Sequence, residues 1–343
     1  MARNLGALGC WKSNEVTPRE FSEDDVRIRP KERTRPRTKD RPDYSASQIA
    51  RVIAVDRGRT TCLIEESGLV VTAMKSRELG KKSVVVGDLV SIVGDISGSE
   101  GSLSRIVVVQ PRANVLTRTI DDSAEFERMI VSNVDQIGIV IAAADPEPRH
   151  GFVDRALVVA FDQGITPLII VTKCDLADPS EFLQIYNELD IQVIRIERGA
   201  DLTSLRKAIR HKRTVLLGHS GVGKSTLVNA LTQTQSRATG DVNSATGRGR
   251  HTSSSAVALK IDLDENETGW IIDTPGVRSF GLAHVERDRV IGAFPEFAPA
   301  IEHCPKNCSH DEENCALNHW PSLSESALGR LANLRRLLAE GSK

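Results

Sequence analysis

The alternation of apolar and polar residues changes character twice along the chain, and this pattern predicts three folded regions after a polar start. Short apolar runs separated by Gly and Asp fill residues 46–115 and predict the strands of a small β-barrel. Residues 116–285 alternate strand-like apolar runs with helical periodicity, which predicts a largely parallel sheet with helices on both faces. Residues 286–343 predict short helices, so we expect a multi-domain chain.

The same runs set the expected bounds of the individual elements. The strands expected in the first region are Gln48–Val55, Thr60–Ile64, Leu69–Ala73, Val84–Val86, Leu89–Val93 and Ile106–Val109. Those expected in the second region are Ile137–Ala143, Leu168–Val171, Gln192–Ile196, Thr214–Leu217, Val257–Leu263 and Trp270–Ile272. The helices expected there are Phe152–Gln163, Pro179–Leu189, Leu202–Arg210 and Lys224–Thr232. A final helix should pack through the leucines Leu328, Leu331, Leu334, Leu337 and Leu338. Several short strands in the first region suit an OB-like barrel.

The polar start, residues 1–45, alternates Arg and Lys with Pro and predicts a disordered basic tail. Such a composition cannot bury enough apolar surface to offset its ordering entropy. The tail either contacts nucleic acid or is simply solvated, and its composition fits both. The formal net charge of the whole chain is -1, so any contact with nucleic acid must come from local basic patches.

The expected barrel contains no Phe, Tyr or Trp and therefore lacks a platform for base stacking. We expect it to touch RNA, and not DNA, through backbone or shape contacts. The candidate side chains are Arg51, Arg57, Arg59, Lys75, Arg77, Lys81 and Lys82.

The chain carries no sign of a membrane segment. It contains no run of about eighteen apolar residues, which a membrane helix needs. Met1–Cys10 lacks the basic start and the longer apolar stretch of a lipoprotein signal. We therefore expect a cytoplasmic protein, without membrane contact, that acts as a monomer.

A phosphate-binding loop of the GxxxxGKS type follows the expected strand Thr214–Leu217 and opens the helix at Lys224. Its glycines let backbone N–H groups surround phosphates, and the helix N-terminus adds positive dipole character. Lys224 should reach the β- and γ-phosphates, and Ser225 should bind Mg²⁺. The candidate phosphate-binding residues are Gly218, His219, Ser220, Gly221, Val222, Gly223, Lys224, Ser225 and Thr226.

Two further motifs end apolar strands on either side of this loop in the sequence. Asp273-Thr274-Pro275-Gly276 places a carboxylate where it can hold Mg²⁺ and a Gly276 N–H where it can meet the γ-phosphate. Thr172-Lys173-Cys174-Asp175 offers a carboxylate to the N1–H and 2-amino donors of guanine, which adenine lacks. The usual first residue of such a segment is Asn, and Thr172 has no amide for the base edge. The guanine segment precedes the phosphate loop, which is the reverse of the common order.

The segment between the phosphate loop and Asp273 includes a glycine-rich basic stretch, residues 247–255. Thr252 could complete the Mg²⁺ shell, although the stretch is also consistent with a flexible Ser/Gly loop. Many GTPases place a water-orienting Gln directly after the Gly of the Asp273 motif, but Val277 stands there. The nearest substitute is His251, which could position water once a partner orders the loop.

Three of the six cysteines gather near one histidine in the last region. Cys304, Cys308, His310 and Cys315 supply three thiolates and one imidazole, which suits a closed, tetrahedral structural Zn²⁺ site. In a cytosolic protein this spacing favours metal over disulfides.

Together these residues resemble the circularly permuted GTPases, specifically the ribosome small-subunit-dependent (RsgA-like) family. The resemblance rests on the barrel, the order TKxD, GxxxxGKS, DTPG, the GRGRHT stretch, the DTPGVRSF segment at 273–280 and the Cys/His cluster. The segment Asn133-Val134-Asp135 and the pair Asp154-Arg155 also look like family landmarks. The chain differs in its tighter zinc spacing, in its basic tail, and in Ile196–Gly199, which replaces the usual Ser-Ala guanine loop.

The resemblance implies a GTP hydrolase that joins late maturation of the small ribosomal subunit, contacts its rRNA, and is activated by that subunit. It also implies that His251 is the hydrolytic residue. Because Val277 replaces the water-orienting Gln, a nucleotide-gated RNA-binding module with little hydrolysis is an alternative. A permuted GTPase that acts on the large subunit is a third possibility, and only the resemblance argues against it.

Overall fold

A computed structural model describes residues 44, 47–56, 58–80, 83–119, 127–233, 256–263, 267–274, 285–320 and 325–340. The chain separates into two units, Met1–Asp43 and Tyr44–Lys343, and every described residue lies in the second. The expected basic tail, apart from Tyr44, therefore lies outside the described residues. The described parts contain no helix suited to crossing a membrane.

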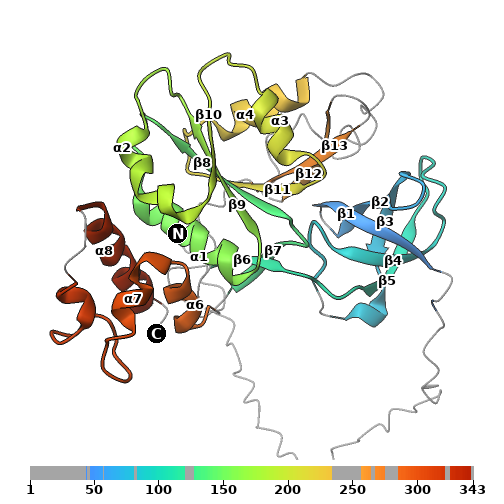
Figure 1. Ribbon diagram of the computed structural model, residues 1–343. Helices are drawn as coiled ribbons and strands as arrows, with labels where there is room; N and C mark the ends of the chain where they lie inside the picture. Colours follow the sequence, from blue (N-terminus) through green and yellow to red (C-terminus); the bar gives the residue numbers. More distant parts are fainter. Residues whose placement is uncertain are drawn as a thin grey trace, which may run out of the picture. The chain divides into compact units, whose positions relative to one another are not determined.

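The first folded region is a five-stranded barrel (Figure 1). Its strands are β1 (Gln48–Asp56), β2 (Arg59–Ile64), β3 (Val70–Lys75), β4 (Leu89–Gly94) and β5 (Ser104–Val109). They pair in the order β1-β2-β3-β5-β4, and the antiparallel pairing of β4 with β1 closes the barrel. Alternate residues such as Val52, Cys62 and Ile106 are fully buried inside it, as a period of two requires. The expected strand Val84–Val86 is wrong, because only Val86 takes part in an isolated bridge, to Val131.

The second region is built on strands that continue the same sheet. Their order is β10-β9-β8-β11-β13-β12, and all neighbours are parallel except β12 and β13. The strands are β8 (Gln136–Ala142), β9 (Thr166–Thr172), β10 (Gln192–Arg195), β11 (Arg213–Leu217), β12 (Val257–Asp262) and β13 (Thr268–Asp273). Every residue of β8 is buried, which explains why this strand shows a continuous apolar run instead of alternation.

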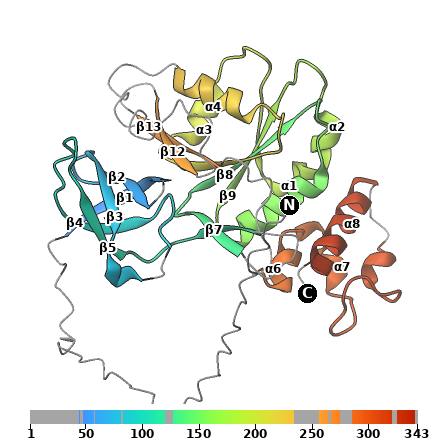
Figure 2. The ribbon, with the colours of Figure 1, turned by 180° about the vertical axis from the view of Figure 1, so that it is seen from behind.

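Helices cover both faces of these parallel strands (Figures 1 and 2). They are α1 (His150–Asp162), α2 (Ser180–Leu183), a 3-10 helix η3 (Gln184–Leu189), α3 (Thr203–Ile209) and α4 (Lys224–Gln233). Ile137 and Ile139 of β8 share one apolar cluster with α1, whereas Val140 shares another with α3 and α4. The prediction of a largely parallel sheet with helices on both faces is therefore confirmed.

A two-stranded hairpin, β6 (Val115–Thr119) and β7 (Glu127–Ser132), joins the barrel to the parallel strands. The sequence pattern did not predict it.

A buried polar junction lies close to the end of this hairpin. Asp88 accepts from the Ser132 hydroxyl at 2.6 Å and from Arg112 Nε at 2.6 Å. Gly87 has φ +93°, and a Cβ there would lie 1.9 Å from the Ser132 carbonyl oxygen. Only glycine therefore permits this close approach.

The last region packs short helices around the cysteine cluster. They are α6 (Arg287–Gly292), η6 (Pro295–Phe297), α7 (Ala298–Ile301), η7 (Ala316–Asn318) and α8 (Glu325–Glu340). Helix α8 contacts α1, α6 and η3, and it buries Leu331, Leu334, Leu337 and Leu338. The inclusion of Leu328 in this stripe was wrong, because it is 53% exposed on the first turns of the helix, where these neighbours do not cover it.

Candidate nucleotide site and metal centre

The phosphate loop lies between β11 and α4, at the carboxyl edge of the parallel strands. Gly221 and Gly223 have φ of +85° and +87°, a backbone region in which side chains other than glycine are strained. A Cβ on Gly218 would lie 2.8 Å from the Val140 carbonyl oxygen, so this position also requires glycine. The loop leaves Ser220 exposed, buries Val222, and leads into the helix that begins at Lys224.

The charges of Lys224 and Asp273 lie close enough to interact at this edge of the sheet. Burial lowers the pKa of the Lys224 ammonium, and the charge of Asp273 partly opposes that shift. Asp273 Oδ1 is buried and has no hydrogen-bond partner among the described residues. Thr274 fixes the strand end, because its hydroxyl donates to the Leu216 carbonyl at 3.1 Å. A buried carboxylate oxygen without a partner suits a hard cation such as Mg²⁺. Ser225, the other predicted ligand from the phosphate loop, follows Lys224 and is exposed.

The guanine segment begins at the end of β9, two strands from β11 in the sheet order. The Thr172 hydroxyl donates to the Val222 carbonyl at 2.6 Å and lies 3.2 Å from the Ile141 carbonyl oxygen. Lys173 adopts φ +58°, and its ammonium donates to the Asp145 carbonyl. The structure thus brings the guanine segment and the phosphate loop into direct contact, although they are far apart in the sequence.

Asp175 is exposed, and its Oδ1 accepts the backbone N–H of Arg198 at 3.0 Å. Arg198 belongs to Ile196–Gly199, the segment that stands in place of the usual Ser-Ala loop. Sequence reasoning did not assign Arg198 a role, because its contribution is a backbone group and no side-chain motif marks it. This segment therefore holds the carboxylate of Asp175, the candidate guanine acceptor, through a backbone N–H group.

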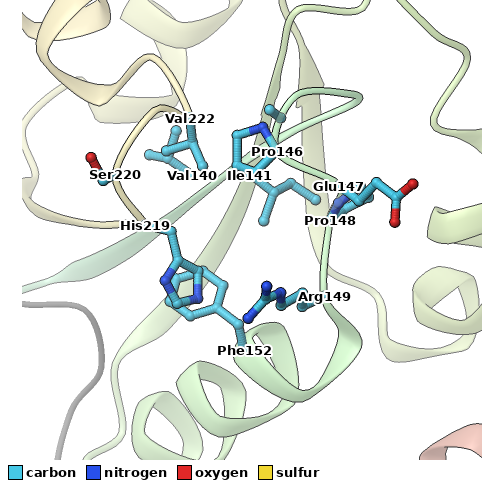
Figure 3. A pocket seen from close by; sticks show the side chains of 11 residues that line it. Val140, Ile141, Pro146, Glu147, Pro148, Arg149, Phe152, His219, Ser220 and Val222 are labelled. Carbon is cyan, nitrogen blue, oxygen red and sulfur yellow. The ribbon is translucent and has the colours of Figure 1, made fainter.

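A cavity of about 270 Å³ lies beside the phosphate loop (Figure 3). The rings of His219 and Phe152 form one wall, with centroids 4.5 Å apart and planes tilted by 49°. Arg149 lies next to Phe152, and Pro146 and Pro148 line the opposite side. His219 thus packs on the first turn of α1, and this contact links the phosphate loop to that helix.

Several predicted site residues lie outside the described residues. These are His251 and Thr252 of the glycine-rich stretch, and Gly276 after Asp273, together with Val277. Ser225 and Thr226 are described and lie exposed on the first turn of α4.

The cysteine cluster brings all four predicted metal ligands together. Ligand atoms of Cys304, Cys308, His310 and Cys315 lie within 4.8 Å of one another. Cys304 Sγ is 3.8 Å from Cys315 Sγ and 3.6 Å from His310 Nδ1. Tetrahedral Zn²⁺ with Zn–S near 2.3 Å and Zn–N near 2.0 Å requires edges of about 3.8 Å and 3.5 Å. The arrangement therefore fits Zn²⁺, and the sulfur separation is too long for a disulfide, whose bond is about 2.05 Å.

The neighbours of this cluster hold its backbone and favour the metal-binding form of the histidine. Arg335 Nε donates to the His310 carbonyl at 2.7 Å, and Arg287 donates to the Ser309 carbonyl. Burial lowers the pKa of His310, and so does the positive charge of Arg287. A neutral imidazole is the form that binds a metal.

Asp154, one of the landmarks in the sequence, lies away from the nucleotide motifs at the contact between α1 and α8. Its Oδ1 accepts from Arg330 Nη1 at 2.8 Å and its Oδ2 from Asn333 Nδ2 at 2.6 Å. Arg330 also donates to Glu296, and its guanidinium lies 4.5 Å from the centroid of the Phe294 ring. Burial raises the pKa of Asp154 to about 6, against the opposing effect of Arg330. Two carboxylates therefore share one buried guanidinium.

Comparison with protein families gives one match that fits these motifs. The model described as RsgA GTPase matches residues 109–283. A relative from Gemmatimonas aurantiaca, described as small ribosomal subunit biogenesis GTPase RsgA, is 32% identical over 274 residues, covering 78% of this chain and 87% of that protein. A Pseudomonas aeruginosa relative with the same description is 36% identical over 253 residues, covering 71% of this chain and 72% of the relative.

Two solved structures have the same fold. YjeQ from Thermotoga maritima aligns with a TM-score of 0.61 at 23% identity, over 86% of this chain and 98% of that chain. YloQ, described as a circularly permuted GTPase, aligns with a TM-score of 0.60 at 21% identity, over 89% and 99%. The predicted fold, in which an OB-like barrel precedes permuted GTPase motifs and a C-terminal Cys/His cluster, is confirmed.

Proposed function

The chain belongs to the RsgA GTPase family, and we propose that it hydrolyses GTP during maturation of the small ribosomal subunit. The observation that carries this proposal is the direct contact between the guanine segment and the phosphate loop, together with the buried Oδ1 of Asp273, which is unpaired in the described part of the chain. GTP is the substrate, and GDP and phosphate are the products. The relatives' description as small-subunit biogenesis factors supports the choice of partner.

Each motif has a defined part in handling the nucleotide. Asp175 accepts hydrogen bonds from guanine while Arg198 N–H holds its other oxygen. The phosphate loop surrounds the phosphates with N–H groups, and Lys224 neutralises their charge. Ser225 and Asp273, together with Thr252 in the GTP state, would hold Mg²⁺, which would offset negative charge on the γ-phosphate.

Hydrolysis requires a group that orients water, and His251 takes this part in the proposal. Val277 is apolar and cannot do so, which implies slow turnover until the ribosomal subunit orders the glycine-rich stretch. Gly276 N–H senses the γ-phosphate in the same proposal. After hydrolysis these contacts are lost, and the protein leaves the subunit.

The remaining regions serve attachment. Residues 46–115 form the barrel domain, which contacts rRNA through its backbone and basic side chains, and 116–285 form the GTPase domain. Residues 286–343 form the module held by one structural Zn²⁺ at Cys304, Cys308, His310 and Cys315. The tail, 1–45, adds basic charge. The protein acts as a cytoplasmic monomer.

Turnover of GTP measured in parallel with purified small and large ribosomal subunits tests the proposal. We expect small subunits to raise the rate at least tenfold, large subunits to leave it near the basal value, and ATP to give no turnover. Equal rates with and without small subunits, or ATP turnover that matches GTP, would refute it. A preference for large subunits would instead support action on that particle.

The identity of the hydrolytic residue needs its own variant. We expect His251→Ala to remove the stimulation by small subunits and to retain GDP binding, whereas His319→Ala, an exposed histidine near the zinc cluster, should keep both. If His251→Ala retains full stimulation, His251 has no catalytic part. If the unaltered protein shows no turnover under any condition, Val277 marks a nucleotide-gated RNA-binding module, the alternative function.

A further inference from the structure

Thr172 occupies the position at which a guanine segment usually carries Asn, and its hydroxyl is already engaged. We propose that Thr172 is a positioning residue that holds the phosphate loop, so that the protein recognises guanine without a side-chain donor to N7 from this position. The inference rests on the proposed nucleotide site and deepens it, because it states which atoms of the base are recognised.

The hydroxyl proton of Thr172 is directed at the loop. A threonine hydroxyl has one proton to donate, and the nearer acceptor is the Val222 carbonyl oxygen at 2.6 Å. Thr172 is 6% exposed, so this bond is shielded from water. A Cβ on the next residue, Gly223, would lie 3.5 Å from Thr172 Oγ1. The hydroxyl therefore lies against the part of the loop that leads into α4.

Because the Thr172 hydroxyl donates its proton to the Val222 carbonyl, it cannot donate to the guanine base. Guanine presents two acceptors, N7 and O6, along one edge, and each needs a donor. An Asn amide has two donor hydrogens and can serve both a loop carbonyl and the base, whereas Thr172 can serve only one of them. With its proton on Val222, Thr172 has only lone pairs left, and these do not bind N7. Discrimination between bases then rests on Asp175, which Arg198 N–H holds in place.

Replacement of N7 by carbon tests this directly in the unaltered protein. We expect 7-deaza-GDP to displace a fluorescent GDP analogue with an affinity within threefold of GDP. IDP lacks the 2-amino group that Asp175 reads, and it should bind at least tenfold more weakly. This comparison needs no variant, so it decides the question even if a variant fails to fold. A loss of more than threefold with 7-deaza-GDP shows that a donor reaches N7, and it overturns the inference.

Variants at position 172 test the positioning role. Thr172→Val leaves the Val222 carbonyl without its partner and releases the phosphate loop from the end of β9, so we expect GDP to bind at least about fivefold more weakly. The ratio of GDP to IDP affinity should not change, because the base contacts remain. Thr172→Ser should restore binding, and Thr166→Val, the same change at an exposed position of β9, should have no effect.

The outcomes separate this inference from the proposed function. Unchanged GDP affinity in Thr172→Val, or an altered GDP-to-IDP ratio, contradicts the positioning role while the nucleotide site stands. Absence of GDP binding to the unaltered protein contradicts the nucleotide site itself, and the inference fails with it.

Discussion

Replacement of Arg330 by Met removes the guanidinium shared by Asp154 and Glu296, and we expect a large loss of stability in the C-terminal region. The Arg330 and Asp154 side chains are 2% and 0% exposed, so water cannot take the place of the lost partner. Breaking a buried ion pair from one side costs about 3–5 kcal/mol. The contact of Arg330 with the Phe294 ring is lost as well.

The loss should depend on pH in a defined direction. At pH 7 the Asp154 carboxylate left without its partner either remains charged in a dry site or takes up a proton, and this proton costs about 1.4 kcal/mol per pH unit above the pKa of the unfolded group. Lowering the pH from 7 to 5 should therefore reduce the loss by up to about 2.7 kcal/mol.

Urea unfolding of the zinc-loaded protein at both pH values measures these quantities, and hydrogen exchange in α8 and α1 locates the change. Arg195→Met provides the control, because Arg195 pairs with Asp178 on the surface, where both side chains are more than half exposed. An exposed pair contributes about 0–1 kcal/mol. If Arg330→Met costs no more than this control, or if its cost is the same at both pH values, the buried network does not stabilise the contact between α1 and α8.

Three further outcomes follow from the structure. Burial raises the pKa of Asp154 to about 6, so its stabilising contribution is complete below the pKa of this carboxyl in the unfolded chain and is lost as pH rises through about 6. Urea unfolding should therefore show the unaltered protein gaining stability relative to Asp154→Asn when the pH is lowered from 7 to 5. Gly87→Ala, which places a Cβ 1.9 Å from the Ser132 carbonyl oxygen, should lower the midpoint of thermal unfolding by several degrees, whereas Gly292→Ala in α6, where the space is open, should not. Cys315→Ser should reduce bound zinc, measured by metal analysis, from about one per chain to well below it, and unchanged zinc content would count against the four-ligand site.

The phosphate loop was predictable because its geometry depends on residues that are close together in the sequence. Gly218 marks a position where a Cβ would clash with the Val140 carbonyl oxygen, and Gly221 and Gly223 adopt a positive φ that strains other residues. The strand before them and the helix after them show strong apolar periodicity. The barrel strands were predictable for the same reason, since residues of period two such as Val52 and Cys62 bury one face.

Features that depend on distant partners could not be read from the pattern. Asp154 pairs with Arg330, which lies far along the chain, and no motif in the sequence around either residue indicates this pairing. Thr172 lacked the expected amide, but its bond to Val222 depends on how β9 lies against the phosphate loop. The hairpin of β6 and β7 crosses the point where the barrel pattern ends, so no single periodicity covers it.

The antiparallel pairing of β1 with β12 means that the barrel also covers part of the edge of the GTPase sheet. In the sheet order β12 would be the last strand of the GTPase region, and Ala54 of β1 pairs with Val257 at its beginning. An uncovered edge strand can recruit other chains. The barrel therefore covers the beginning of β12, directly after the glycine-rich stretch. A GTPase region expressed without its barrel would lose this cover at Val257, and the exposed strand end would be open to pairing with another chain.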